Sequence, residues 1–347
     1  MKNNAKKTKK LLPLAVLLAA AALLGILLAV LTRSSTDAAD TTIPLCGFTA
    51  EEIDRLAYSG NNRDVTLLKG STGDWMLDSD PALPLDQAKV TSLVEQYAAL
   101  AALRKLEGSD LAELPEKSAA PQMTITIGAG DKTLALTVDQ LNAVADVYYV
   151  YDESGAAYTV MRSDLATLSK SPRDLYKAQT LTDKTLSDVA AMQVNDLQFT
   201  QTDGSWTLTD DPDYPVSQSS IKKMAGTILQ MQTAWTVTAP EADTAYGLDS
   251  PDVTAVLTFT DGTSLTVRFG NAVAAAADGS DGDSLCYLAS DAAPTVVYEV
   301  NADSKLAYAV TKESLYEETA TAETAASDPV AQYPVGGEDD YADSLPE

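Results

Sequence analysis

The sequence predicts an α+β protein built from two tandem homologous units, each an antiparallel sheet with a packed amphipathic helix, after one N-terminal transmembrane helix. Three observations predict it. A stretch of 21 residues near the N-terminus carries no charge, a set of landmarks recurs at a constant offset of 131 residues, and apolar residues follow both strand and helix periodicity. The predicted segments are a cytoplasmic basic segment (1–10), a transmembrane helix (11–31), a linker (32–45), unit 1 (46–181), unit 2 (182–317) and an acidic disordered tail (318–347).

The uncharged stretch, Leu11 to Leu31, is long enough to cross a bilayer. At about 1.5 Å per residue its 21 residues span roughly 32 Å, and lipid requires a helix because it offers the backbone no hydrogen-bond partner. Only Arg33 follows it closely, so the excess of positive charge before it predicts a cytoplasmic N-terminus and an extracytoplasmic body. The preceding lysines are Lys2, Lys6, Lys7, Lys9 and Lys10.

A cleaved signal peptide is the alternative interpretation of this segment. Its apolar stretch is usually only about 7–15 residues and ends at a small-x-small site, whereas Ala38 and Ala39 offer a poor site here. Lipidation at Cys46 is rejected because bulky Leu45 precedes it and the apolar stretch ends 15 residues earlier. We therefore expect an uncleaved anchor, with the membrane as partner through Leu11–Leu31.

Composition limits the chemistry of the body. The first 33 residues hold six basic and no acidic side chains, which leaves 18 basic against 50 acidic, a net charge of −32. Such a body repels nucleic acid, and we interpret the charge as a solvated surface, with cation binding as the alternative. The chain has no histidine, which removes the commonest general base and most zinc sites. Its two cysteines, Cys46 and Cys286, cannot hold an iron–sulfur cluster, and nothing in the sequence pairs them.

The internal repeat is anchored by two tryptophans, Trp75 and Trp206. Each follows a glycine by two residues, and each precedes an Asp-Pro pair, a second proline and a helical stretch at the same spacing. Registration over so many positions predicts a duplication. The matched landmarks are Gly73 and Gly204, Asp80-Pro81 and Asp211-Pro212, and Pro84 and Pro215.

Each unit is expected to contain a strand pair with the tryptophan, a helix and four further strands. The helices are predicted at Asp86–Leu103 and Ser217–Trp235, with Asp86 and Ser217 as N-caps. Asp261-Gly262 lies between alternating runs and predicts a hairpin. The further strands are predicted at Met123–Ile127, Leu134–Val138, Tyr148–Tyr151 and Ala157–Met161 in unit 1, and at Val253–Phe259, Leu265–Phe269, Leu285–Leu288 and Thr295–Val300 in unit 2.

The ends of the units also match. Each closes on a short helix and a Leu-Tyr pair, Leu175-Tyr176 in unit 1 and Leu315-Tyr316 in unit 2. The tryptophans could serve as ligand platforms, but equal placement beside a turn and before a helix favours a role in the core. Beyond Glu317 the chain has Asp and Glu but no Lys or Arg, a composition that cannot bury a core.

This two-copy plan resembles the domain of unknown function 4340 family, over roughly residues 46 to 317. The Gly-x-Trp-x-Leu strand, the Asp-Pro-x-x-Pro turn and the Leu-Tyr ending carry the resemblance, and Leu175–Leu186 with Arg173 looks like the family's stretch between repeats. The family consists of membrane-anchored bacterial extracytoplasmic proteins often encoded beside ABC-type transporters. The resemblance therefore implies an accessory role at a transporter permease and carries over no catalytic residue.

No motif singles out a site. The run Asp278–Asp283 offers hard oxygen ligands, but an EF-hand loop from Asp278 would need glycine where Asp283 stands and glutamate at Ala289, so we interpret a solvated insertion. We therefore expect no catalytic, metal or cofactor residue, and a non-enzymatic binding or accessory protein. Two alternatives stay open: a surface module for peptide, glycan or divalent cation, with a pocket between the units, and a hydrolase that uses a carboxylate pair.

Overall fold

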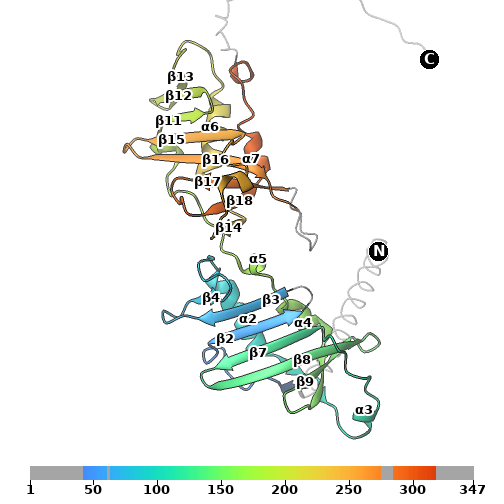
Figure 1. The fold of residues 1–347 in the computed structure, drawn as a ribbon. Coiled ribbons are helices and arrows are strands. Elements are labelled where there is room, and N and C mark those ends of the chain that lie inside the picture. The colour runs from blue at the N-terminus through green and yellow to red at the C-terminus, as the bar shows by residue number, and fades with distance from the viewer. Residues whose placement is uncertain (1–41, 61–62, 275–283, 318–347) are drawn as a thin grey trace, which may run out of the picture.

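The computed structural model describes residues 42–60, 63–274 and 284–317. Within them the chain forms two units placed end to end, each with an eight-stranded antiparallel sheet and a few helices (Figure 1), as predicted at that level. The predicted anchor, the Asp278–Asp283 run and the acidic tail lie outside the described residues. Among the residues described, no helix is long and apolar enough to cross a membrane.

The sheet of unit 1 has the strand order β4-β3-β2-β7-β8-β9-β10-β6. A separate two-stranded pair, β1 with β5, stands beside it, so Ile43–Pro44 of the predicted linker pair with unit 1. The strands are β1 (Ile43–Pro44), β2 (Arg55–Gly60), β3 (Arg63–Lys69), β4 (Trp75–Leu77), β5 (Ala101–Ala102), β6 (Arg104–Lys105), β7 (Met123–Ala129), β8 (Lys132–Asn142), β9 (Val147–Asp152) and β10 (Ala157–Met161). The helices are α2 (Gln87–Ala98), α3 (Ser109–Ala112), α4 (Arg162–Leu168) and α5 (Pro172–Leu175).

The sheet of unit 2 has the strand order β13-β12-β11-β15-β16-β17-β18-β14. Its strands are β11 (Val189–Val194), β12 (Leu197–Thr202), β13 (Ser205–Leu208), β14 (Trp235–Val237), β15 (Val253–Phe259), β16 (Ser264–Ala272), β17 (Leu285–Ser290) and β18 (Val297–Asn301). Its helices are η1 (Leu186–Asp188), α6 (Gln218–Leu229), η2 (Asp243–Ala245), α7 (Asp303–Leu306) and η4 (Glu313–Leu315).

The two sheets share one topology. In each, a three-stranded meander leads into a helix, the chain then forms the opposite edge strand, and a four-stranded meander fills the space between. Even the irregularities match, since the register shifts at Val138/Leu141 in one sheet and at Phe269/Ala272 in the other, again 131 residues apart. A shared bulge is strong support for duplication because bulges are specific local features of a sheet.

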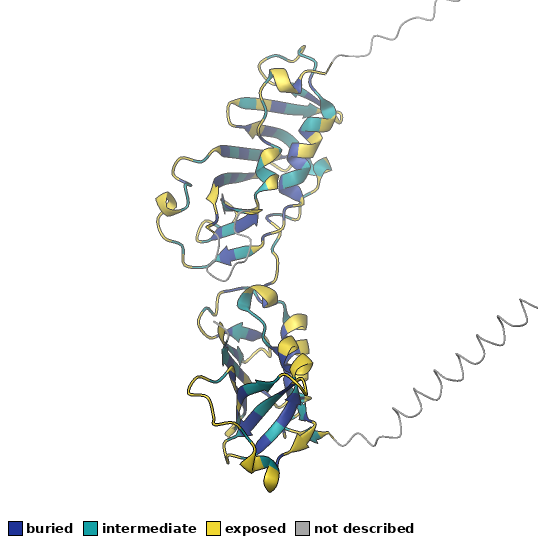
Figure 2. Cartoon of the chain, turned by 90° about the vertical axis from the view of Figure 1, so that its right-hand side faces the viewer, coloured by how far each residue is buried: buried dark blue, intermediate teal, exposed yellow. Residues whose placement is uncertain are grey.

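The long helices begin where the sequence predicts. Asp86 accepts hydrogen bonds from the backbone of Ala88 and Lys89, and Ser217 accepts one from Ser220, so both act as N-caps. One face of each helix is buried against the sheet, as Figure 2 shows by colour. The buried helix residues are Val90, Leu93, Val94 and Tyr97 in α2, and Ile221, Met224, Ala225, Ile228 and Leu229 in α6.

Two predictions about these regions are wrong. The helices end at Ala98 and Leu229, not at Leu103 and Trp235. After α2 the chain forms β5 and then the edge strand β6, and after α6 it forms the edge strand β14. Each sheet accordingly has eight strands, not six; the first strands, β2 and β11, were also missed. Apolar residues continue through these short segments, which hides the change from helical to strand spacing.

Both tryptophans are core residues. Trp75 is 6% exposed and Trp206 is 1% exposed, and each belongs to the main apolar cluster of its unit. The first residue of each helix, a glutamine, holds the tryptophan strand in place. Gln87 Oε1 accepts from Trp75 N at 2.7 Å, and Gln87 Nε2 donates to Trp75 O at 2.9 Å.

Unit 2 repeats this arrangement with Gln218. Its amide accepts from Trp206 N and donates to Trp206 O, both at 2.7 Å. The same backbone hydrogen bonds therefore hold the tryptophan strand in both copies. The interpretation of the tryptophans as core residues is confirmed by their burial.

The units meet at a polar and aromatic joint. Tyr176, after α5, is 5% exposed, and its hydroxyl is 2.6 Å from Thr233 Oγ1 and 2.7 Å from Thr236 Oγ1 of unit 2. Trp235 of β14 packs against the apolar core of unit 1, with its ring centroid 5.3 Å from that of Tyr176. The joint therefore buries groups from both units together.

An ion pair crosses the same joint. Arg173 of α5 donates to both carboxylate oxygens of Glu299 on β18, at 2.7 and 3.0 Å, and its guanidinium lies 4.8 Å from the centroid of the Trp235 ring. The Glu299 side chain is 5% exposed and that of Arg173 is 41% exposed. Such a two-pronged contact fixes orientation because both groups are planar.

Candidate functional site

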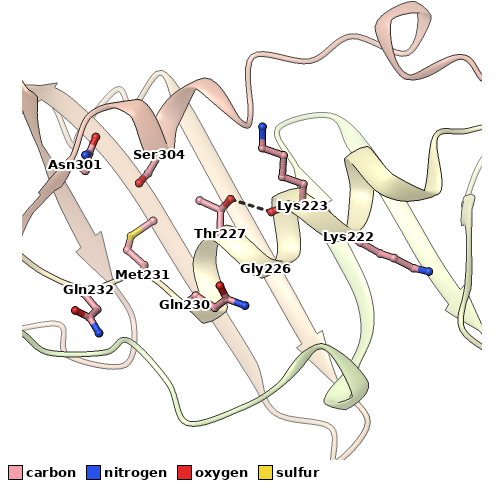
Figure 3. A pocket seen from close by; sticks show the side chains of 9 residues that line it. All are labelled: Lys222, Lys223, Gly226, Thr227, Gln230, Met231, Gln232, Asn301 and Ser304. Carbon is pink, nitrogen blue, oxygen red and sulfur yellow. Dashed lines mark hydrogen bonds between the residues drawn. The ribbon is translucent and has the colours of Figure 1, made fainter. Parts of the chain in front are cut away.

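The candidate site is a groove on unit 2 beside helix α6, hereafter the α6 groove (Figure 3). It consists of two adjoining hollows of about 480 and 600 Å³ that share several lining residues. Side chains from α6, from the segment after it and from β18 and α7 line it. The first hollow is lined by Lys222, Lys223, Gly226, Thr227, Gln230, Met231, Gln232, Asn301 and Ser304, and the second adds Asp303, Leu306 and Ala307.

The floor of the groove is the exposed side of α6. Gly226 lies inside the helix, and a Cβ added there would meet nothing within 4 Å, so no packing requires glycine. Glycine within a helix costs about 1 kcal/mol relative to alanine. Its effect here is to leave the helix backbone without a side chain between Lys223 and Thr227 (Figure 3). The Thr227 hydroxyl donates to the Lys223 carbonyl at 2.8 Å.

The charge of the groove contrasts with the rest of the unit. The described part of unit 2 has six Lys or Arg residues, of which four form ion pairs within the unit: Lys184, Arg268, Lys305 and Lys312. The other two, Lys222 and Lys223, are exposed and have no carboxylate partner among the described residues. Lys222 lines the first hollow, whereas Lys223 lines both and shares the second with Asp303.

The remaining lining groups suit a peptide-like ligand. The amides of Gln230, Gln232 and Asn301 both donate and accept hydrogen bonds. Leu306 is 69% exposed and gives the second hollow an apolar patch. Ammonium groups, amides and one large apolar side chain together match an acidic segment with an apolar residue.

Unit 1 is built differently at the corresponding place. Its helix α4 buries Leu165 and Leu168 against α2, and the Tyr97 hydroxyl donates to the Leu168 carbonyl at 3.1 Å. In unit 2 the corresponding helix, α7, has only four residues and buries none of them. The groove therefore results from a shorter helix after β18. At the positions of the two lysines, unit 1 has Thr91 and Ser92.

A hollow of about 330 Å³ in unit 1 has a different character. Its lining includes Arg63 and Arg162, but Arg63 donates to the Ser169 carbonyl and Arg162 pairs with Asp146 at 3.7 Å. These cations already have partners. The hollows described here each lie within one unit, whereas the sequence predicted a ligand pocket between the units.

The cysteines are separate and shielded. Cys46 is buried in the core of unit 1 and Cys286 in that of unit 2, and both are free thiols. Burial raises the pKa of the Cys286 thiol to about 11 and also raises the pKa of Cys46. At neutral pH both are therefore protonated and weakly nucleophilic. Within the ranges described, no cluster of three or more His, Cys, Asp or Glu side chains is placed to hold a metal ion.

The sequence did not single out the groove or the joint. Lys222 and Lys223 look like the ordinary polar face of an amphipathic helix. The available signal was two adjacent lysines followed by an interior glycine, in a body of strongly negative charge. For the joint, the available signal was a charged residue, Glu299, on the same face of its strand as the apolar Val297, because both residues are buried.

Fold and groove together define a class: a tandem-repeat α+β protein with a mixed polar and cationic surface groove on its second unit. Comparison of the chain with family models, with curated proteins and with solved structures gave no match.

Proposed function

We propose that the protein is a non-enzymatic accessory protein, anchored in the membrane by Leu11–Leu31, that binds an acidic segment of a partner in the α6 groove. The observation that carries this is the pair of exposed lysines without carboxylate partners among the described residues, beside amides and the exposed Leu306. In an acidic body such a spot attracts anions and does not repel them. The partner class is a transporter permease, as the resemblance to the domain of unknown function 4340 family implies.

The arrangement of the units supports this use. The pair of β1 with β5 lies at the start of unit 1, and the joint places unit 2 beyond it (Figures 1 and 2). With an anchor before residue 42, unit 2 would be the membrane-distal unit. The joint would then hold the groove at a set distance and direction, which lowers the entropy lost when a partner binds.

Co-purification with the full-length protein in mild detergent tests the proposal. We expect a transporter permease, identified by mass spectrometry, to co-purify with the wild type and to be lost from Lys222→Gln/Lys223→Gln. The matched control is Thr91→Glu/Ser92→Glu, which lowers the net charge by the same two units at the equivalent turn of α2. Equal permease recovery with both variants would contradict a role for the groove, and no permease with the wild type would contradict the partner class.

A second candidate is a surface module that binds a free ligand. The size of the groove favours it, because hollows of about 300–1,000 Å³ are typical of sites for small ligands. In that case a short acidic peptide or an anionic glycan should raise the melting temperature of the wild type but not that of Lys222→Gln/Lys223→Gln. No shift with either ligand would eliminate this candidate.

A further inference from the structure

We infer that the acidic C-terminal tail of the same chain occupies the α6 groove, with the segment Glu338–Tyr341 as its contact. The inference adds regulation to the proposed function, because the tail would compete with the partner for Lys222 and Lys223. This regulatory role rests on the proposed function. The origin of the tail, its length and its chemistry each support this contact.

The tail begins close to the groove. Tyr316 pairs with Val216, and Glu317 N donates to the Pro215 carbonyl at 3.0 Å, so the chain leaves unit 2 beside the start of α6. Ser217 caps that helix. At about 1.5 Å per residue, Lys222 is roughly 8 Å along the helix from the cap and Gln230 is roughly 20 Å along.

The length of the tail suits that span. Glu338 follows Glu317 by 21 residues, and a flexible chain of that length has a root-mean-square reach of about 25 Å. A tether whose reach matches the distance gives an effective concentration in the millimolar range. Contacts too weak to hold a free peptide can therefore hold the tail.

The chemistry of the segment complements the groove. Glu338, Asp339 and Asp340 are three consecutive carboxylates followed by Tyr341, and residues 318–347 contain no Lys or Arg. The carboxylates match the ammonium groups of Lys222 and Lys223, and the tyrosine ring matches the exposed Leu306. Exposed ion pairs are individually weak and sensitive to salt. The association is therefore reversible, as a competitor of a partner must be.

Zero-length carbodiimide crosslinking of the full chain in detergent micelles tests the inference with no partner present. We expect isopeptide bonds from Lys222 or Lys223 to Glu338–Asp340. They should be at least fivefold more abundant than any from Lys177, which is exposed and whose backbone N–H donates to Pro84 of unit 1. About 1 M salt should remove most of them, because it shortens the screening length to about 3 Å. Links no more frequent than those of Lys177, or unchanged in salt, would overturn the inference.

A mixture of ¹⁴N- and ¹⁵N-labelled protein identifies the source of the tail. Links within one isotope support an intramolecular contact, whereas hybrid links at the statistical frequency would overturn it and assign the tail to a second copy.

Chymotryptic cleavage after Tyr341 in the full chain gives a second measurement, which does not depend on the chemical reactivity of the lysine side chains. Lys222→Gln/Lys223→Gln should speed the cleavage several-fold, and Thr91→Glu/Ser92→Glu should leave its rate unchanged. Equal rates in the two variants would count against the tail contact. Neither measurement depends on a permease, so the tail contact and the proposed function can fail separately.

Discussion

Tyr176 and Tyr316 hold the same position in the two units, yet one is 5% exposed and the other 54%. Each pairs with the residue before a helix N-cap, Leu85 in unit 1 and Val216 in unit 2. The exposures differ because β14 and Thr233 of the second unit cover Tyr176. The duplication thus gave each unit the same local structure, and among the described residues only the copy in unit 1 is covered by another unit.

Substitution of the tryptophans should have the largest effect and tests whether the cores of the two units are equivalent. Trp75→Ala and Trp206→Ala should each lower the free energy of unfolding by about 3–5 kcal/mol, because each removes a large buried ring and leaves a cavity. Urea denaturation followed by circular dichroism measures it. Trp206 Nε1 has no hydrogen-bond partner among the described residues, so Trp206→Phe should cost much less than Trp206→Ala. A loss below 1 kcal/mol in either alanine variant would break the equivalence of the two cores.

The joint gives the next largest effect, and here the two units should differ. A double-mutant cycle of Arg173→Ala and Glu299→Ala should give a coupling of about 1–2 kcal/mol, moderate because Arg173 is 41% exposed. Glu313 stands where Arg173 stands in the other unit, so Glu313→Ala with Glu299→Ala is the matched control and should show no coupling. Zero coupling for Arg173 would mean that the aromatic contacts alone hold the joint.

The glutamines should have nearly equal effects in the two units. Gln87→Ala and Gln218→Ala each remove hydrogen bonds to a tryptophan backbone, and each should cost about 1–2 kcal/mol. Thermal unfolding of both single variants measures this. A cost confined to one unit would show that the shared geometry stabilises only one of them.

The helix caps give the smallest expected effect. Asp86→Ala and Ser217→Ala should each cost about 1 kcal/mol, since each leaves backbone N–H groups at a helix start without a partner. Asp86 accepts two such bonds and Ser217 one, so the loss at Asp86 should be the greater. The reverse order, measured by urea denaturation, would contradict the capping geometry.

Local signals predicted much of this fold. The Trp, Asp-Pro and Pro landmarks identified the duplication, and Asp86 and Ser217 marked the helix starts, because capping and turn residues act over a few positions. The edge strands β6 and β14 were missed because they are very short and pair with strands far along the chain, Arg104 with Thr159 and Trp235 with Glu299. Long-range pairing of this kind leaves no periodic signal.

The candidate site was invisible for a related reason. The α6 groove depends on the short length of α7 and on which lysines lack a partner, and both follow from tertiary contacts. From the sequence alone, Lys222 and Lys305 are equivalent surface lysines. Only the fold shows that Lys305 pairs with Asp252 whereas Lys222 lacks a carboxylate partner within the residues described.

The carboxylate that binds the neighbouring unit in unit 1 has a different partner in unit 2. In unit 1, Asp80 accepts a hydrogen bond from Thr238 of the next unit, but the equivalent Asp211 is bound by Lys312 of its own unit at 2.8 Å. Lys312 also lies over the Tyr214 ring, which packs against Tyr316. The acceptor that binds the next unit in unit 1 is thus taken up by an internal lysine in unit 2, so the two ends of the repeat present different chemistry to whatever lies beyond them.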